Sequence, residues 1–181
     1  MHSHEGRQIL VASQPNVRCL VISRLVPLLV ILFSSLVLAE ETVDSVLVDK
    51  SDEKLFLLSG DKVVAEFSVA FGGDPKGHKQ KEGDEKTPEG HYILDYKKSD
   101  SSFYKAIHIS YPNEEDKKAA AALGVDPGGL IMIHGQRNGL GWLAWITQAF
   151  NWTDGCIAVK NSDMDEIWDA VPKNTPIEIR E

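Results

Sequence analysis

The stretch that decides the fold is residues 153–159, which read Thr153-Asp154-Gly155-Cys156-Ile157-Ala158-Val159. Its second half is an apolar strand, and a glycine and a cysteine stand directly in front of that strand. A second apolar run, at residues 130–133, ends in His134-Gly135, and His134 lies 22 positions before Cys156. A thiol nucleophile and its base need a cysteine and a histidine presented in this way. The two segments therefore predict strands that carry Cys156 and His134 as nucleophile and base.

Further outward, the first 39 residues have the pattern of an export signal. Two arginines precede an apolar stretch at residues 25–39. Its length of about 15 residues fits a signal-peptide core and is short of the roughly 20 that span a membrane. Small residues at Val37 and Ala39 predict cleavage before Glu40. We expect a signal peptide at residues 1–39, one catalytic domain at residues 40–181, and a location in the periplasm or cell envelope. An uncleaved N-terminal anchor is the alternative.

Cleavage at this point leaves Cys156 as the single cysteine of the protein. A single cysteine forms no internal disulfide, and a free thiol in an oxidising compartment needs a chemical reason to be there. The alternative is a buried cysteine that packs as a small hydrophobic residue.

The chain is acidic, with 19 lysines and arginines against 27 aspartates and glutamates and a net charge of −8. The expected cleavage removes three arginines and one glutamate, which takes the net charge to about −10. A domain this acidic lacks the basic surface of a nucleic-acid binder. Long-range attraction to an anionic polymer is also absent, so a substrate of that charge has to be held by contacts inside a pocket.

The order of elements along residues 40–181 predicts a β-rich α+β fold with a few short helices. Alternating and apolar runs predict a hairpin at 43–48 and 54–58 and a third strand at 62–70, followed by a long glycine-rich loop at 72–90. A helix over 114–123 is expected between an Asn113 cap and Gly124. The apolar spacing predicts a second helix over 163–171 with Ser162 as its N-cap. The remaining expectations are strands at 91–96, 106–111, 130–133, 157–159 and 175–179, and a short helix or flap at 141–150.

The pair His134 and Cys156 suits acyl transfer by a thiol. A neutral imidazole takes the thiol proton, or the two groups form an ion pair, and the thiolate attacks a carbonyl carbon. The ion pair predicts a thiol pKa well below the value of about 8.5 for free cysteine. The backbone amides of Gly155 and Cys156 are candidates for an oxyanion hole.

Three separated motifs extend this interpretation. They are residues 71–90, which include Gly72-Gly73 and Thr87-Pro88-Glu89-Gly90, then Ile131 to Gly135, then Thr153 to Asn161. In this order they resemble the L,D-transpeptidase catalytic domain, the YkuD-type family, over roughly residues 43–179. The resemblance implies an exported domain with a β-sandwich-type core that acts on peptidoglycan stem peptides. It implies that Cys156 attacks the carbonyl of the third stem residue and expels the terminal D-alanine.

The resemblance also assigns roles to individual residues. The Gly135 carbonyl corresponds to the group that orients the imidazole of His134, and Thr153 and Gly155 occupy their places in the cysteine motif. The family has His or Arg where this chain has Asp154, and Asn or Arg where it has Ala158, which leaves the substrate contacts open. The expected substrate-binding residues are Thr153, Asp154, Arg137 and Trp152.

The expected partners are peptidoglycan stem peptides and, for some acceptors, a protein attached to peptidoglycan. We expect a monomer, no nucleic acid and no cofactor. No metal is expected either, because His78, His91 and His108 lack ligand spacing. Trp142 and Trp145 either line a substrate groove or fill the core. Two alternatives to a transpeptidase stay open: a cysteine hydrolase with water as acceptor, and a non-catalytic peptidoglycan-binding module.

Overall fold

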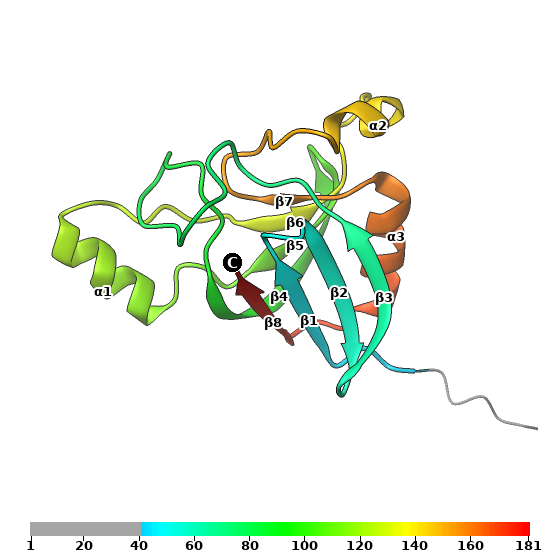
Figure 1. Ribbon diagram of the computed structural model, residues 1–181, viewed down its shortest axis with the longest axis horizontal. Coiled ribbons are helices and arrows are strands. Elements are labelled where there is room, and N and C mark those ends of the chain that lie inside the picture. The colour runs from blue at the N-terminus through cyan, green and yellow to red at the C-terminus, as the bar shows by residue number, and fades with distance from the viewer. Residues whose placement is uncertain (1–40) are drawn as a thin grey trace, which may run out of the picture. The chain divides into compact units, whose positions relative to one another are not determined.

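The computed structural model describes residues 41–181, so the expected signal peptide and its cleavage point lie outside the described residues. Figure 1 shows the arrangement of the elements. They are β1 Ser45–Asp49, β2 Lys54–Ser59, β3 Lys62–Ser68, β4 Gly90–Ser101, β5 Tyr104–Ile109, α1 Glu114–Leu123, β6 Met132–His134, the 3₁₀ helix η1 Gly141–Leu143, α2 Ala144–Thr147, β7 Ile157–Ala158, α3 Asn161–Ala170 and β8 Thr175–Arg180. Within the described part of the chain, no helix is long and apolar enough to cross a membrane.

The eight strands form one mixed sheet in the order β3-β2-β1-β8-β4-β5-β6-β7. The last strand, β8, lies in the middle of this order, parallel to β1 and antiparallel to β4. Beyond β3 the chain crosses to the opposite edge, where Ala70 and Ala158 donate backbone hydrogen bonds to each other at 2.9 and 2.8 Å. This pair of bonds, called the seam below, joins the two ends of the sheet. The predicted β-rich α+β fold is confirmed.

Alternating side chains explain why the strands enclose a single core. In β8, Thr175, Ile177 and Ile179 are buried and the residues between them are exposed, the period of two that a half-buried strand requires. All eight strands and α3 contribute to one apolar cluster. Its fully buried members include Leu55, Leu57, Leu94, Ile107, Ile109, Ile133, Ile157, Met164, Ile167, Ile177 and Ile179.

Helix α1 begins and ends where its capping residues predict. The Asn113 side chain accepts hydrogen bonds from the amides of Glu115 and Asp116, and the Asp116 carboxylate accepts one from the Asn113 amide. Gly124 ends the helix in the left-handed conformation, at φ +68°. These contacts satisfy backbone groups that a helix end leaves unpaired.

The expected start of α3 is wrong. The helix begins at Asn161, directly after β7, and Lys160 rather than Ser162 is its N-cap. The Lys160 carbonyl already accepts a hydrogen bond from Met164 N, so the first turn forms before Ser162 is reached. Ser162 lies inside the helix, and its hydroxyl donates to Asp163.

Strand β4 is longer than expected and continues to Ser101, where a tight turn leads into β5. The extension over residues 97–101 is polar, so it lacks the apolar alternation by which strands are recognised. Its pairing with β5 is irregular between Leu94 and Lys97, where the partner residues are Ile109 and Ile107. Three steps on β4 therefore match two steps on β5, which defines a β-bulge.

Candidate active site

Cys156 and His134 lie on the same face of the sheet. The parallel strands β6 and β7 place Ala158 opposite His134, and Cys156 stands two residues before Ala158. Residues two apart in an extended chain point to the same face, and directly opposite residues share a face. Both side chains line one cavity of about 340 Å³. The structure therefore brings together the two residues on which the sequence analysis rests.

The imidazole of His134 is buried and held by its neighbour. Its Nδ1 lies 2.7 Å from the carbonyl oxygen of Gly135, and a carbonyl only accepts, so Nδ1 carries the hydrogen. In the neutral ring this leaves Nε2 free to take a proton. Phe103 packs over the ring at 4.7 Å between centroids, and Trp152 meets it edge-on at 5.8 Å. The contact expected from the Gly135 carbonyl is present.

Burial sets the protonation states of both groups. It lowers the pKa of His134, and the hydrogen bond to Gly135 offsets only part of this effect. It raises the pKa of the Cys156 thiol; the charge of Asp154 adds to the rise, while the Met132 amide and Lys79 act against it. Both shifts favour the uncharged forms, a neutral thiol and a neutral imidazole. Of the two arrangements considered from the sequence, these directions favour the neutral one over the ion pair with its low thiol pKa.

Thr153 braces the backbone around the nucleophile. Its hydroxyl donates to the carbonyl of Cys156 at 2.7 Å and accepts from the amide of Gly155 at 3.2 Å. Thr153 lines the cavity, but its hydroxyl is occupied by the main chain. The Gly155 amide has its own acceptor in this hydrogen bond, so its role as an oxyanion donor stays a prediction.

Gly155 occupies a place that no other residue fits without strain. Its φ is +114°, and a Cβ atom there would lie 2.4 Å from the carbonyl oxygen of Lys86. The buried hydroxyl of Thr87 donates to the carbonyl of Gly155 at 3.0 Å. The end of the glycine-rich loop therefore packs directly against the residue before the nucleophile. The sequence analysis placed residues 72–90 in a loop and missed this contact.

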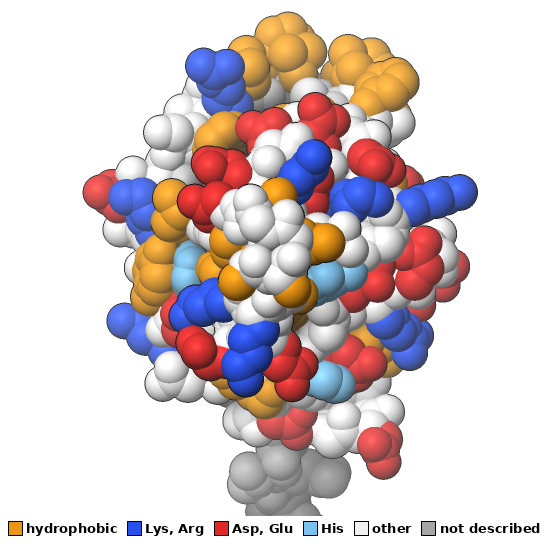
Figure 2. All heavy atoms as spheres, turned by 90° about the vertical axis from the view of Figure 1, so that its left-hand side faces the viewer, with side chains coloured by type: hydrophobic (Ala, Val, Ile, Leu, Met, Phe, Trp, Pro, Cys, Tyr) orange, Lys and Arg blue, Asp and Glu red, His pale blue; other side chains and the backbone are white. Residues whose placement is uncertain are grey.

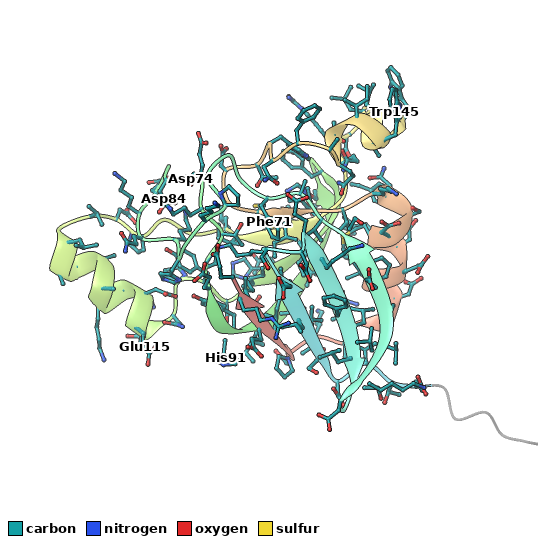
Figure 3. The ribbon with its side chains drawn as sticks, in the orientation of Figure 1. Phe71, Asp74, Asp84, His91, Glu115 and Trp145 are labelled. Carbon is teal, nitrogen blue, oxygen red and sulfur yellow. The ribbon has the colours of Figure 1, made fainter. Side chains whose placement is uncertain are left out.

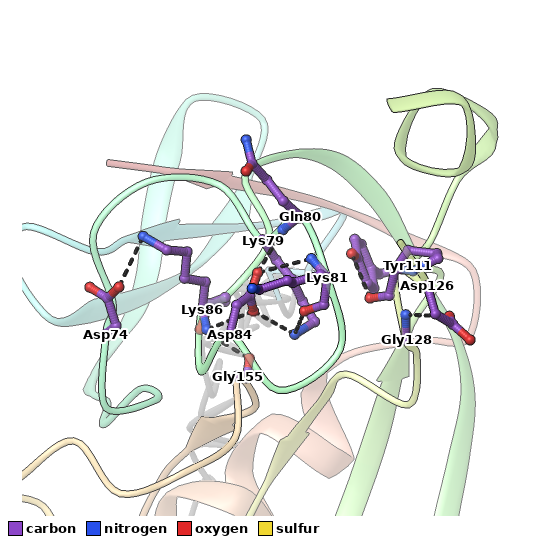
Figure 4. A network of polar contacts seen from close by, with 12 residues as sticks. Asp74, Lys79, Gln80, Lys81, Asp84, Lys86, Tyr111, Asp126, Gly128 and Gly155 are labelled. Atoms are coloured by element: carbon purple, nitrogen blue, oxygen red, sulfur yellow. Dashed lines mark hydrogen bonds and ion pairs between the residues drawn. The ribbon is translucent and has the colours of Figure 1, made fainter. Parts of the chain in front are cut away.

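The loop that makes this contact is organised by a buried ion pair (Figure 4). The side chain of Lys79 is 3% exposed and lies 2.8 Å from Asp84 Oδ1. The Asp84 carboxylate also accepts from the amides of Gln80, Lys81 and Lys86 at 2.8 to 3.1 Å. Burial raises the pKa of Asp84, but Lys79 and the three amides outweigh it and bring the pKa to about 2.

The other expected substrate-binding residues fall in different places. Trp152 lines the cavity of Cys156, and the exposed Asp154 lies between it and a neighbouring cavity of about 400 Å³ that also contains Glu82 and Glu85. Arg137 is exposed and lines a third cavity of about 330 Å³. That cavity shares Phe103 and Trp152 with the first, so Arg137 lies on the far side of these two rings.

The two other tryptophans of the expected flap are not core residues. Trp142 is 72% exposed and Trp145 74%, and Phe150 nearby is 67% exposed. Figure 3 shows Trp145 pointing away from the body of the domain. Figure 2 shows hydrophobic side chains gathered at this upper end, whereas acidic and basic side chains alternate over the rest of that face.

The sequence analysis missed two residues near His134, one that packs on its ring and one two positions after it in the chain. Phe103 lies in the turn between β4 and β5, and Asn138 fixes this turn by donating to Ser101 O and accepting from Tyr104 N. Gln136 is fully buried, and its amide group donates to Val159 O at 2.8 Å. Neither has a spacing or composition signal in the sequence, because each gains its role from a contact between distant segments.

A free thiol and an imidazole with an open Nε2 in one shared cavity are the groups that a cysteine nucleophile of the acyl-transfer class requires. Comparison with known proteins supplies the family. The chain belongs to the YkuD family, the L,D-transpeptidase catalytic domain, which it matches over residues 44–179.

The chain is also similar to one curated protein that is named for this activity and to two solved structures. The chain is 37% identical over 97 residues to the putative L,D-transpeptidase YafK of Escherichia coli K12, a match that covers 52% of this chain and 32% of YafK. Among solved structures it is similar to the helical cell shape determining protein Pgp2 of Campylobacter jejuni (K307A mutant), with 29% identity and a TM-score of 0.60. That match covers 78% of this chain and 48% of Pgp2. Bd1075 of Bdellovibrio bacteriovorus follows with 26% identity, a TM-score of 0.54, and 77% and 48% coverage. The chain thus spans about a third of YafK and about half of the other two.

Proposed function

We propose that this protein is an L,D-transpeptidase that modifies peptidoglycan stem peptides through a thioester on Cys156. The observation that carries the proposal is the cavity into which Cys156 and His134 both project, with the Nε2 atom of His134 free to act as a base. Membership of the L,D-transpeptidase catalytic domain family supports the substrate class. Export to the cell envelope belongs to the same proposal, because stem peptides lie outside the cytoplasmic membrane.

The chemistry follows from the protonation states. His134 Nε2 takes the proton of the Cys156 thiol as the sulfur attacks the substrate carbonyl carbon, which gives a tetrahedral oxyanion. When this intermediate collapses, the bond to the terminal D-alanine breaks, and the leaving amine takes the proton from His134. The acyl group is then a thioester on Cys156. An acceptor amine that loses its proton to His134 attacks the thioester, forms the new amide and releases the thiolate, which His134 reprotonates.

The charges next to the site favour an amine as the acceptor. Asp154 lies at the border of the cavity of Cys156, and Glu82 and Glu85 line the neighbouring cavity. Carboxylates at this position attract an ammonium group and have no such effect on water. Cross-linking and attachment of a protein both use an amine acceptor, whereas hydrolysis uses water at the same thioester.

The test is mass spectrometry of the purified protein after incubation with disaccharide tetrapeptide muropeptides, and separately with a muropeptide that carries a linked peptide. Cross-linked dimers that are absent with Cys156→Ala establish transpeptidation. Release of D-alanine or of the linked peptide without dimers establishes a hydrolase. If neither substrate changes while the circular dichroism spectrum shows a folded protein, the enzymatic proposal is wrong and the binding-module alternative is favoured.

A further inference from the structure

A β-bulge decides which lysine of β4 faces the active site. Lys97 pairs with Ile107, whose side chain is in the core, and the Lys97 ammonium donates to the carbonyl of Trp168 on α3. Lys98 pairs with Ala106 and therefore points to the other face. Without the extra residue between Leu94 and Lys97, the faces of these two lysines would be exchanged.

Lys98 stands in one row with the catalytic base. Ala106 is opposite Lys98 on one side and opposite His134 on the other. Since neighbouring strands lie about 4.8 Å apart, the backbones of Lys98 and His134 are separated by about 10 Å. Ala106 between them is fully buried and has only a methyl group, so this row has no larger side chain between Lys98 and His134. All three residues line the cavity that contains Cys156.

Lys98 is the one cationic side chain among the described residues that line this cavity. The other charged residue in the lining is Asp154. The cysteine motif therefore brings a negative charge to the cavity, and the only positive charge comes from a strand far away in the sequence.

The ammonium group of Lys98 can exchange its present ion-pair partner for a carboxylate of a ligand. Its Nζ lies 3.0 Å from Asp100 Oδ1, with side-chain exposures of 44% and 85%. Ion pairs this exposed contribute little to stability, because water solvates both groups. A carboxylate of a bound ligand can therefore take the place of Asp100 at small cost.

We propose that Lys98 binds the C-terminal carboxylate of the stem peptide and so positions the scissile carbonyl at Cys156. This inference rests on the proposed function and names the residue that recognises its donor substrate. The carboxylate of the terminal residue is one residue away from the scissile carbonyl, a span of about 3.5 Å. A peptide whose carbonyl is next to Cys156 therefore has its carboxylate inside the same cavity, into which the four-methylene stem of Lys98 can carry its ammonium group. Arg137, which was expected to meet a substrate carboxylate, lines the adjoining cavity instead.

The test compares two tetrapeptide muropeptides that differ only at the C-terminus, one with a free carboxylate and one with a primary amide. Steady-state release of the terminal residue is measured with the wild type and with Lys98→Gln, Lys98→Arg and Lys62→Gln. The matched control is Lys62 on the far strand β3, another exposed lysine, which pairs with the carboxylate of Glu41. Binding of both peptides to Cys156→Ala and to Cys156→Ala/Lys98→Gln is measured by calorimetry.

We expect Lys98→Gln to lower kcat/KM for the carboxylate peptide about tenfold or more, chiefly by raising KM, since it removes a charge-assisted hydrogen bond. For the amide peptide, Lys98→Gln should change kcat/KM little. Lys98→Arg should keep most of the wild-type preference for the carboxylate over the amide peptide, and Lys62→Gln should match the wild type on both. Equal losses on both peptides, or no preference for the carboxylate in the wild type, would overturn the role of Lys98 while the proposed function stands. If the wild type processes neither peptide, the proposed function fails, and calorimetry still decides whether Lys98 recognises the carboxylate.

Discussion

At the scale of single residues, the nucleophile and its base are kept uncharged by burial. His134 is under 5% exposed, and its ring is covered by Phe103 and Trp152, which disfavours the imidazolium. The thiol of Cys156 meets the same desolvation and the charge of Asp154 besides. In the proposed reaction, we therefore expect the thiolate to form only when His134 removes the proton during attack.

The rate of alkylation of Cys156 by iodoacetamide, measured against pH, should reflect this state. Because the pKa of the thiol is raised, the inflection should lie above the value of about 8.5 for free cysteine. Asp154→Asn removes a negative charge beside the thiol and should move the inflection downward, whereas the remote Asp61→Asn should leave it in place. An inflection well below 8.5 would contradict the neutral pair and restore the ion pair.

The same scale shows what the sequence could and could not predict at the site. Cys156, His134 and the carbonyl of Gly135 were predicted because each belongs to a short motif, and a few adjacent residues are enough to indicate its chemistry. Lys98 was not, because its direction depends on a bulge that no propensity indicates. Phe103 was missed for a similar reason, since its turn is fixed by Asn138 from another segment.

At the scale of elements, the loop at residues 72–90 acts as a support for the nucleophile. Its buried Lys79–Asp84 pair fixes the chain that leads to Lys86 and Thr87, and both of these contact Gly155. A loop of this length without regular structure would otherwise be mobile. The ion pair replaces the strand pairing that the segment lacks.

Asp84→Asn should lower the free energy of unfolding by about 3 kcal/mol or more, because it leaves the Lys79 ammonium buried without a counter-charge. Denaturant unfolding of the two proteins measures this difference. The pKa of Asp84 is about 2 when folded, below its ordinary 3.8, so its contribution is present above pH 4 and is lost as the pH falls toward 2. The wild type should therefore lose more stability than the variant over that interval.

Asp74→Asn is the matched control in the same loop. Asp74 also pairs with a lysine, Lys86, at 3.2 Å, but its side chain is 60% exposed. Its replacement should change stability by no more than about 1 kcal/mol. Equal effects of the two substitutions would show that burial of the Lys79–Asp84 pair has no special importance.

Elements differ in how well their sequence specified them. Helix α1 was predicted to the residue because Asn113 and Gly124 mark its ends by local hydrogen bonding. The start of α3 was not, since the segment after β7 enters the helix without a side-chain cap. The end of β4 was missed because its last residues are polar and pair with β5 in solvent.

At the scale of the described domain, the first strand, β1, pairs directly with the last strand, β8. Strand β8 lies between β1 and β4, so the two parts of the sheet, β3-β2-β1 and β4-β5-β6-β7, become neighbours in this order only through the C-terminal strand. The strands themselves were predicted from alternation, whereas their order was not, because pairing between distant segments leaves no periodic signal.

One core shared by all eight strands should unfold in a single cooperative step. Far-UV circular dichroism and accessibility of Cys156 to a thiol reagent, followed through a guanidinium titration, should give the same midpoint. A thiol that becomes accessible at clearly lower denaturant would show that the site opens separately from the sheet.

The seam has a further consequence for the timing of reactivity. Next to it, Phe71 donates to the side chain of Asn151, which is 80 residues away in the sequence. Contacts over such separations form late, since the intervening chain must first be ordered. A partly folded chain therefore lacks the arrangement of Cys156 and His134, and we expect the thiol to gain its proposed reactivity only after the two ends of the sheet have met.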